Sequence, residues 1–209
     1  MGVRRDCMRA QIGRELIRRI VEGEYAPGDR LVELRIAREF DTSQGPVREA
    51  LRELEALRLV ETEPYKGTRV RAISLQEQRE AAAVRGVLEE AAAKRAAGVL
   101  RGDTQALQEE VAAIKSAAIQ GDLDGYARRN NTFHRKIVEA AGNAVMLRLW
   151  DTLQLEARTR IGLGTFRHDL QVAADSHWPI VEALEAGDGE RAGTLLREHA
   201  ERFGGGDAP

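Results

Sequence analysis

Cysteine is almost absent from this chain, whose 209 residues include one, Cys7. A single cysteine cannot form a disulfide within the chain, so we expect a reducing compartment, the cytoplasm. Long apolar runs are missing too. No stretch of about 18 apolar residues occurs, so we expect no membrane span. The amino terminus carries charge but no apolar segment, and we therefore expect no secretory signal.

Aromatic residues and net charge are also scarce. Phe, Trp and Tyr make up 4% of the chain, and the formal net charge is −2. Alanine and leucine dominate instead, which is typical of closely packed helices. Residues 1–72 hold 15 Lys and Arg against 13 Asp and Glu, and the remainder holds 17 against 21. The first part is therefore only mildly basic, so any affinity for nucleic acid must come from placed contacts and dimerisation.

A polar turn followed by an apolar stripe lies at residues 41–57. Asp41, Thr42 and Ser43 are turn and N-cap types, and we expect the hydroxyl of Ser43 to accept a hydrogen bond from the first helical turn. Pro46 follows in that turn, where its missing N–H costs nothing. Apolar residues then recur at helical spacing at Val47, Leu51, Leu54 and Leu57.

A shorter helical pattern precedes this turn at residues 33–40, with Leu34, Ala37 and Phe40 expected to face inward. Two short helices joined by a tight polar turn predict a helix-turn-helix. The second helix of such a motif enters the major groove of DNA with its amino end first.

A β-hairpin is predicted directly after the second helix. Residues 59–62 and 68–71 read as short strands around a turn that has Gly67 at its tip. Lys66 and Arg69 flank a backbone that can approach phosphate closely, because glycine has no side chain. The hairpin therefore has the character of a wing beside the helix-turn-helix.

Residues 8–72 resemble the winged helix-turn-helix of the GntR family of bacterial transcription regulators. The segments that carry the resemblance are 23–31, 43–51, 59–60 and 66–67. This chain has Gln44 where the family usually has arginine. Glutamine pairs better with adenine, whereas arginine forks onto guanine. The resemblance implies base contacts near Gln44 and Gly45, a phosphate contact by Arg48 and wing contacts near Lys66 and Gly67. We also expect Ser43, Arg52 and Arg69 to contact DNA.

A capping box at Ser74 to Glu77 marks the start of a second domain. We predict a winged helix-turn-helix domain at 1–73, a helical domain at 74–203 and a disordered tail at 204–209. The fold class is thus mainly α, and the second domain is an all-α antiparallel bundle. Six helices are expected in it, including one at 145–161, one at 169–186 with Pro179 inside it, and one at 189–203. Another is expected at 75–100, with an inner face made of Val84, Val87, Leu88, Ala91 and Ala92.

Three of the four histidines lie on inner faces of predicted helices: His134, His177 and His199. His134 and His199 each follow a Gly-Asp cap by about 18 Å of helix, so they are expected to lie level. Asn130 is one turn before His134 on the same face. Histidines with an oxygen ligand suit zinc, nickel, manganese or iron. The alternative is that the three are separate core histidines bonded to backbone or glutamate. The fourth histidine, His168, is expected to lie at the surface.

Residues 75–203 resemble the FCD effector domain of the FadR-type branch of GntR regulators. The resemblance rests on Asn130-x-x-Phe133-His134, Gly142-Asn143, His177-x-x-Ile180, Gly187-Asp188, His199 and Arg85-x-x-Leu88-Glu89. It implies a divalent metal (zinc, nickel or manganese) held by His134, His177, His199 and Asn130, together with a small carboxylate effector. Asn130 stands where the family has aspartate. A metal site with neutral histidines and this amide carries about +2, which favours an anionic effector.

Three arginines are candidates for clamping the effector carboxylate: Arg85, Arg158 and Arg160. The alternative is a solvated helix face for Arg158 and Arg160, and an ion pair with Glu89 four residues on for Arg85.

These patterns predict a ligand-responsive, DNA-binding transcription regulator that acts as a homodimer on a palindromic operator, and not an enzyme. One alternative is a metal-dependent hydrolase built on the three histidines. Against it, the sequence has no HExxH or nucleophile motif, and offers only Glu139 or Glu182 as a base. A further alternative is a metal-free bundle that only dimerises.

Overall fold

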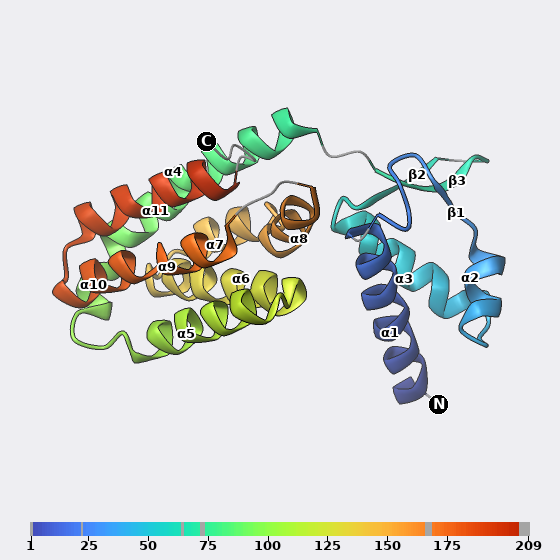
Figure 1. Ribbon diagram of the computed structural model, residues 1–209, viewed down its shortest axis with the longest axis horizontal. Helices are drawn as coiled ribbons and strands as arrows, with labels where there is room; N and C mark the ends of the chain where they lie inside the picture. The colour runs from blue at the N-terminus through green and yellow to red at the C-terminus, as the bar shows by residue number, and fades with distance from the viewer. Residues whose placement is uncertain (1, 22, 64, 72–73, 166–168, 205–209) are drawn as a thin grey trace. The chain divides into compact units, whose positions relative to one another are not determined.

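The chain folds into two compact units, residues 1–73 and 74–209. A computed structural model describes residues 2–21, 23–63, 65–71, 74–165 and 169–204 (Figure 1). The first unit combines helices with a small sheet, and the second is helical throughout its described part. The predicted fold class is therefore confirmed. None of the described helices combines the length and apolar character that a membrane span needs.

The described part of the first unit has three helices: α1 (Gly2–Val21), α2 (Glu33–Glu39) and α3 (Gln44–Ala56). Helix α3 packs against α1 and α2, and this arrangement is the predicted helix-turn-helix. One expectation for α2 is wrong, because Leu34 is exposed and Ile36 is buried in its place. The two residues lie about 200° apart around the helix, so they cannot share a face.

A three-stranded antiparallel sheet completes this unit, with β1 (Arg30–Leu31), β2 (Val60–Glu63) and β3 (Gly67–Val70) in the order β1-β3-β2. Strands β2 and β3 are the predicted hairpin, paired in register from Val60 opposite Val70 to Glu63 opposite Gly67. Strand β1 was not predicted, because two residues are too few to show alternation. It pairs with β3 and so ties the hairpin to the chain that leads into α2.

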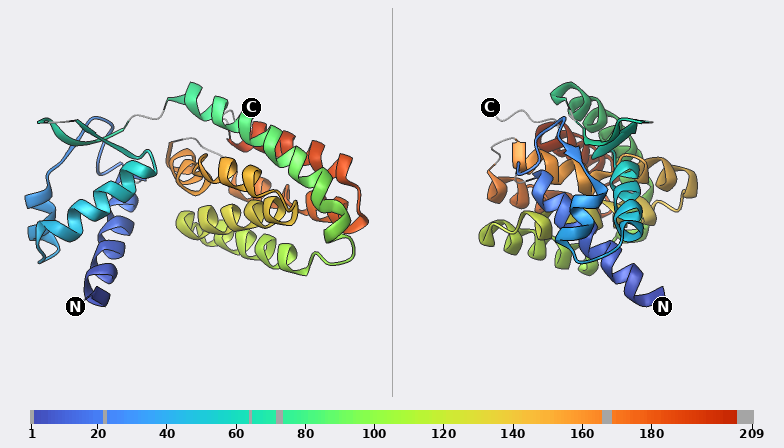
Figure 2. Two further views of the ribbon diagram at one scale, coloured as in Figure 1. Left: turned by 180° about the vertical axis from the view of Figure 1, so that it is seen from behind. Right: turned by 90° about the vertical axis from the view of Figure 1, so that its right-hand side faces the viewer.

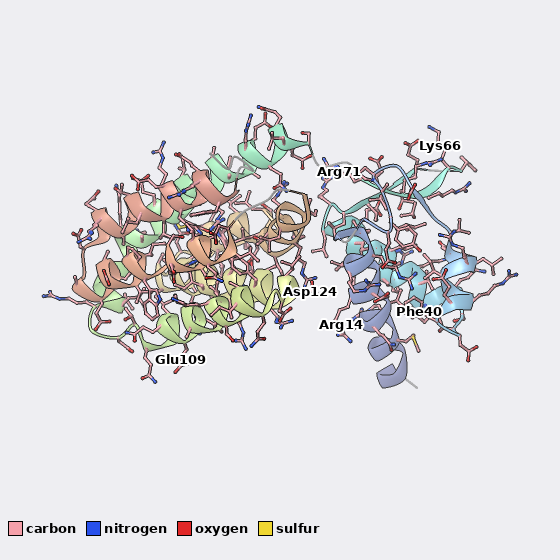
Figure 3. The ribbon with its side chains drawn as sticks, viewed as in Figure 1. Arg14, Phe40, Lys66, Arg71, Glu109 and Asp124 are labelled. Carbon is pink, nitrogen blue, oxygen red and sulfur yellow. The ribbon has the colours of Figure 1, made fainter. Side chains whose placement is uncertain are left out.

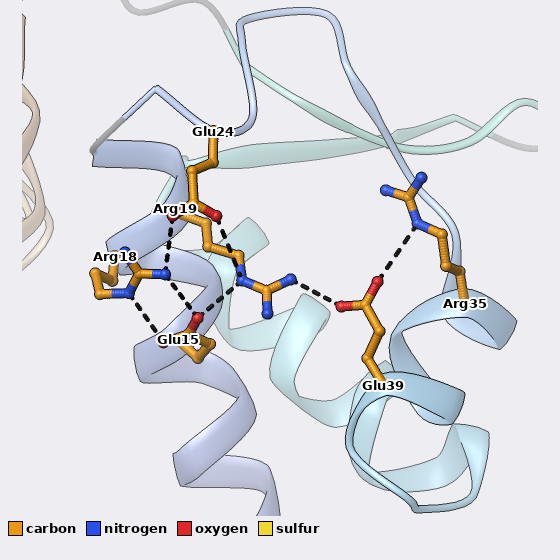
Figure 4. A network of polar contacts seen from close by, with 6 residues as sticks. All are labelled: Glu15, Arg18, Arg19, Glu24, Arg35 and Glu39. Atoms are coloured by element: carbon orange, nitrogen blue, oxygen red, sulfur yellow. Dashed lines mark hydrogen bonds and ion pairs between the residues drawn. The ribbon is translucent and has the colours of Figure 1, made fainter.

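A network of ion pairs holds α1 to α2 and to the loop between them (Figure 4). Arg19 lies 2.8 Å from Glu15 within α1 and 2.8 Å from Glu39 on α2. Arg18 lies 2.8 Å from Glu15 and 3.0 Å from Glu24. The guanidinium groups of Arg18 and Arg19 lower the pKa of Glu15 to about 2. The network thus contributes to the position of α2 ahead of the turn into α3.

The described part of the second unit contains eight helices, because two of the six predicted helices are each split. The break between α7 and α8 falls at Gln154, whose φ is +52° and therefore not helical. Pro179 does not kink a long helix but lies in the first turn of α10, where proline is favoured. The helices are α4 (Leu75–Leu100), α5 (Gln105–Gln120), α6 (Leu123–Ala140), α7 (Ala144–Asp151), α8 (Leu155–Thr165), α9 (Leu170–Asp175), α10 (Trp178–Ala186) and α11 (Gly189–Gly204).

Helices form both described ends of this unit. Ser74 caps α4 as the capping box predicts, and its hydroxyl accepts from the Glu77 N–H at 3.0 Å. Helix α11 reaches Gly204, which the sequence placed in a tail. The rest of the predicted tail, residues 205–209, lies outside the described residues, as does His168.

Helices α4 and α11 lie side by side along most of their lengths (Figure 2). The expected inner face of α4 is correct for Ala92, which is buried, and wrong for Val84 and Val87, which are 52% and 56% exposed. The buried face instead carries small and charged residues, among them Gly86, Arg85 and Glu89. Small residues allow the two backbones to approach closely, so this contact does not need large apolar side chains.

Two glycines of α11 show how close the approach is. A Cβ at Gly189 would lie 2.9 Å from the Cα of Lys94, and one at Gly193 would lie 3.1 Å from the carbonyl oxygen of Glu90. Both neighbours are backbone atoms of α4, which cannot move aside as a flexible side chain can. Any larger residue at these positions must therefore push the helices apart.

We expect Gly193→Ala to lower the free energy of unfolding of the second unit by about 1–3 kcal/mol, because the added methyl overpacks the α4–α11 contact. Gly98→Ala is the matched control: nothing lies within 4 Å of its Cβ position, and α4 gains up to about 1 kcal/mol of helix propensity. Urea unfolding followed by tryptophan fluorescence measures both, since Trp150 and Trp178 are the chain's two tryptophans. Equal stability of the two variants would contradict the close contact.

Candidate functional site

The amino end of α3 is polar and exposed. Ser43 is the N-cap with extended backbone (φ −83°, ψ 165°), but its hydroxyl makes no capping hydrogen bond, contrary to expectation. Ser43 and Gly45 are exposed, whereas Pro46 and Val47 are buried and anchor the first turn. The tip of this helix is therefore held by apolar contacts on one side and presents free polar groups on the other.

The predicted contact residues of α3 lie on one exposed face. Arg48 donates to Glu33 of α2 at 2.7 Å and to the side-chain oxygen of Gln44 at 3.2 Å. Arg52 pairs with Glu49 at 2.8 Å. Arg48 thus occupies the side-chain oxygen of Gln44 and leaves its amide NH₂ available. The two arginines are exposed and keep their charge at the surface.

Two of the three predicted wing residues, Lys66 and Gly67, lie together at the end of the hairpin. Lys66 is exposed at the outer end of the β2–β3 hairpin (Figure 3) and pairs with Glu63. Gly67 follows with φ +81°, a conformation that favours glycine. Arg69 instead turns back, and its guanidinium donates to the carbonyl of Gly28 at 2.9 Å.

Sequence reasoning missed Arg30 as a wing residue. Its guanidinium lies 3.2 Å from where a Cβ on Gly67 would stand. The signal was weak, because Arg30 belongs to the short strand β1, whose pairing opposite Arg69 only the fold reveals.

The structure brings the rings of His134, His177 and His199 together at the centre of the helical unit. Their ring centroids are 4.4–5.5 Å apart, all three side chains are buried, and their potential ligand atoms lie within 4.8 Å of one another. His134 comes from α6, His177 from the residue before α10 and His199 from α11. The level placement expected from the helix caps is therefore correct for His134 and His199.

The hydrogen bonds of His134 define its tautomer. An Arg85 guanidinium N–H lies 2.7 Å from Nε2 of His134, and a guanidinium can only donate, so Nε2 is the acceptor. The proton is therefore on Nδ1, which lies 3.0 Å from a carboxylate oxygen of Glu89. The two atoms are in contact at this distance, but neither meets hydrogen-bond geometry with any described residue.

His177 is fixed in the same tautomer. Its Nδ1 lies 3.1 Å from the carbonyl oxygen of Ala174, which can only accept, so Nδ1 carries the proton. Its Nε2 lone pair then lies 3.0 Å from the side-chain oxygen of Asn130, a second acceptor. Two lone pairs that face each other are stabilised by a cation between them, or by the Asn130 amide turned so that its NH₂ donates.

His199 completes the set. The hydroxyl of Ser176 donates to the carbonyl of Ala173 at 2.6 Å, so its oxygen accepts from Nδ1–H of His199 at 2.9 Å. All three histidines thus hold their proton on Nδ1 and keep a lone pair on Nε2. Such outer hydrogen bonds are the usual means of orienting histidine ligands toward a metal ion. Ser176 is a supporting residue that the sequence did not reveal.

The charges around these rings are balanced. Burial lowers the pKa of all three histidines, that of His177 to about 3, so each ring is neutral. Burial alone would raise the pKa of Glu89, but Arg85 and His134 offset it and hold the pKa at about 2. Glu89 also accepts from Arg85 at 2.8 Å and from the Trp150 indole at 2.9 Å.

A cavity of about 50 Å³ reaches the histidine cluster at His199, the one ring of the three that lines it. Of the predicted effector residues, Arg85 and Arg158 line it together with Asn130 and His199. Arg158 donates to the carbonyl of Leu153 at 2.9 Å, and its buried Nη1 has no partner among the described residues. Arg158 also pairs with Glu77 at 3.1 Å, so Nη1 is the guanidinium nitrogen of this cavity residue that stays without a partner among the described residues.

Arg160 does not line this cavity, contrary to its grouping with the other two arginines. It lies 3.2 Å from Asp124 and 3.0 Å from Glu156. Two residues of helix separate it from Arg158 by about 200°, so the two side chains leave α8 in different directions.

Comparisons with known proteins agree with this architecture. Residues 8–70 match the model of the bacterial regulatory proteins of the gntR family, and residues 80–202 match the FCD domain. A "Probable D-xylose utilization operon transcriptional repressor" from Paenarthrobacter nicotinovorans is 38% identical, over 95% of this chain and 88% of the relative. The HTH-type transcriptional repressor RspR of Escherichia coli K12 is 29% identical, over 92% and 86%.

Solved structures show the same fold. A GntR regulator from Rhodococcus sp. RHA1 superposes with a TM-score of 0.71 at 26% identity, over 92% of this chain and 93% of that one. Escherichia coli McbR/YncC superposes at 0.70 and 24% identity, with the same coverage of 92% and 93%. The relatives are regulators by name, so the hydrolase alternative is not supported. The chain belongs to the GntR family of bacterial transcription regulators, with a DNA-binding winged helix-turn-helix followed by an FCD domain.

Proposed function

We propose that this regulator is a repressor that binds a palindromic operator as a homodimer in the cytoplasm and responds to a small anionic effector held in the FCD domain. The observation that carries the proposal is a cavity lined by Arg85, Arg158 and His199, where the buried Nη1 of Arg158 has no partner among the described residues. A buried donor without a partner is costly, and an anion in the cavity satisfies it.

The α3 tip and the wing supply the DNA contacts in this proposal. Gln44 and Gly45 meet base edges, and Arg48 exchanges Glu33 for a phosphate. Exposed ion pairs such as Arg48–Glu33 are weak, so the exchange costs little. Ser43, Arg52, Lys66 and Gly67 contact the backbone of the duplex, and Arg69 acts through the turn at Gly28.

Dimerisation is supported by an apolar stripe on α4. Val84 and Val87 lie on adjacent turns, both more than half exposed, on the side of α4 that α11 leaves open. A second copy of the same stripe, related by a two-fold axis, would cover both. Two-fold symmetry in the protein then requires a palindromic operator.

The residues around the histidines fit a divalent metal ion. His134, His177 and His199 would supply Nε2 lone pairs, and Asn130 would supply its side-chain oxygen, a donor set that suits zinc, nickel or manganese. The amide oxygen is uncharged, so the site keeps more positive charge than an aspartate would leave. A bound ion would supply the charge that attracts an effector carboxylate.

The effector class follows from the cavity and from one relative. Arg85 and Arg158 favour a carboxylate, and the cavity volume admits only a small molecule. The relative named for D-xylose utilization makes a small sugar acid a first candidate. Effector binding would favour one placement of the two DNA-binding units over others, and operator affinity would change through this linkage.

We expect Arg48→Ala to weaken operator binding about equally for all sequences, because it removes a phosphate contact. Gln44→Ala should instead relax the preference at one base pair, which a well-placed contact discriminates by about 1–3 kcal/mol. Gel shifts at fixed salt on the region upstream of the gene measure both. Arg197→Ala, in the FCD domain, is the control. Wild-type affinity of the Arg48 variant would contradict the proposed surface.

Zinc, nickel or manganese should raise the melting temperature of the wild-type protein after treatment with a chelator. A metal at about 100 times its Kd stabilises the folded state by about 2.7 kcal/mol. We expect Asn130→Ala to reduce this shift, because the variant loses the proposed oxygen ligand. Its neighbour Asn131 gives the matched control, Asn131→Ala. If no divalent metal shifts the wild type, the metal part of the proposal is wrong.

Small carboxylates should release the wild-type protein from its operator. D-xylonate and D-xylose, which differ in one carboxylate, separate an acid effector from a neutral sugar in the same gel shift. Arg158→Met should lose the response by removing the free donor, whereas Arg160→Met, on the same helix but outside the cavity, should keep it. An unchanged response in the Arg158 variant would exclude the proposed clamp.

A further inference from the structure

We propose that Arg85 is a switch between an empty and a loaded site, because its guanidinium and a divalent metal ion compete for one lone pair, the Nε2 of His134. An effector carboxylate that draws Arg85 away would open this nitrogen to the metal, so metal and carboxylate binding would reinforce each other. The inference rests on the proposed metal and effector site and adds the regulation of that site.

The competition follows from the number of lone pairs. A neutral imidazole has a single acceptor lone pair, and in His134 it receives the Arg85 N–H at 2.7 Å. A metal ion needs the same lone pair, so it cannot bind this nitrogen while Arg85 is there. A guanidinium is also always protonated, and its positive charge repels a cation in a buried site.

Asn130 and His177 make the opposite contribution. With the Asn130 oxygen toward Nε2 of His177, 3.0 Å away, the two acceptors attract a cation between them. Nε2 of His199 is likewise free, since the Ser176 contact uses Nδ1. Three of the four donors are therefore ready for a metal, and the fourth is blocked by Arg85.

The guanidinium of Arg85 can turn from His134 toward the cavity. It lines the cavity, and its Nε donates to Glu89 at 2.8 Å. That bond can act as a pivot while the terminal N–H groups turn from His134 toward a ligand in the cavity. Glu89 remains partnered during the movement, because the Trp150 indole donates to it at 2.9 Å. A carboxylate is a strong acceptor for the released N–H.

The consequence is a coupling free energy between two ligands. Whatever factor the carboxylate adds to metal affinity, the metal must add to carboxylate affinity. Without a carboxylate the site would hold Arg85 as its cation and bind metal weakly. With one, the metal and the effector would assemble together.

Titration calorimetry with zinc, in the absence and presence of acetate as the carboxylate probe, tests this on the full chain. In the wild type, acetate should tighten zinc binding at least about fivefold. In Arg85→Met, zinc should bind at least about fivefold more tightly without acetate, and the acetate effect should disappear. Arg160→Met, outside the cavity, leaves Arg85 on His134, so its zinc affinity without acetate and its acetate effect should both equal those of the wild type.

A second variant guards against loss of folding. Arg85→Met leaves the buried Glu89 carboxylate without its cation, which is destabilising. The double variant Arg85→Met with Glu89→Gln removes both charges, and circular dichroism reports whether each variant folds. The double variant should also bind zinc more tightly than the wild type.

The outcomes separate this inference from the proposed site. If zinc binds the wild type and both Arg85 variants with equal affinity, the metal site stands and the Arg85 switch is wrong. If acetate still tightens zinc binding in the Arg85 variants, the coupling runs through another group and the switch is again wrong. If neither the wild type nor the variants bind zinc, the switch and the proposed metal site both fail.

Discussion

The helical unit depends on one buried carboxylate. Glu89 is fully buried, and an ionised group there is costly unless its lone pairs are satisfied. Arg85 and the Trp150 indole donate to one of its oxygens, and His134 lies beside the other. This arrangement sets the His134 tautomer and the position of Arg85 together. The geometry of the proposed metal and effector site therefore depends on the Arg85–Glu89 ion pair, which is buried inside the helix bundle.

Close packing of α4 on α11 makes that arrangement possible. Glycines at 86, 189 and 193 let the two backbones approach, and α4 then faces the interior with polar side chains as well as small ones. His199 on α11 is brought level with His134 on α6 by the same contact. The core thus gives up part of its apolar area to hold a polar centre, a pattern expected of a site and not of a purely structural bundle.

In the DNA-binding unit, adjacent residues of one helical turn have different roles: some anchor the helix and others are exposed. Pro46 and Val47 are buried, while Gly45 and Arg48 on either side of them are exposed. The ion pairs of Arg19 with Glu15 and Glu39 connect α2 to α1. A helix that presents a few side chains to a groove needs neighbouring elements that hold its polar end rigidly.

Local signals in the sequence determined the elements and the family. The Ser74 cap, the Gly67 turn and the apolar stripe of α3 each act within a few residues, so their meaning does not depend on the rest of the chain. Tertiary structure alone decided which face of α4 is buried, because the alternative stripe with Val84 is equally regular in sequence. It also decided that Arg158 reaches the cavity and Arg160 does not, and which nitrogen of each histidine carries its proton. The His134 tautomer depends on Arg85, 49 residues away, and Arg158 pairs with Glu77, 81 residues away, and no local pattern carries that information.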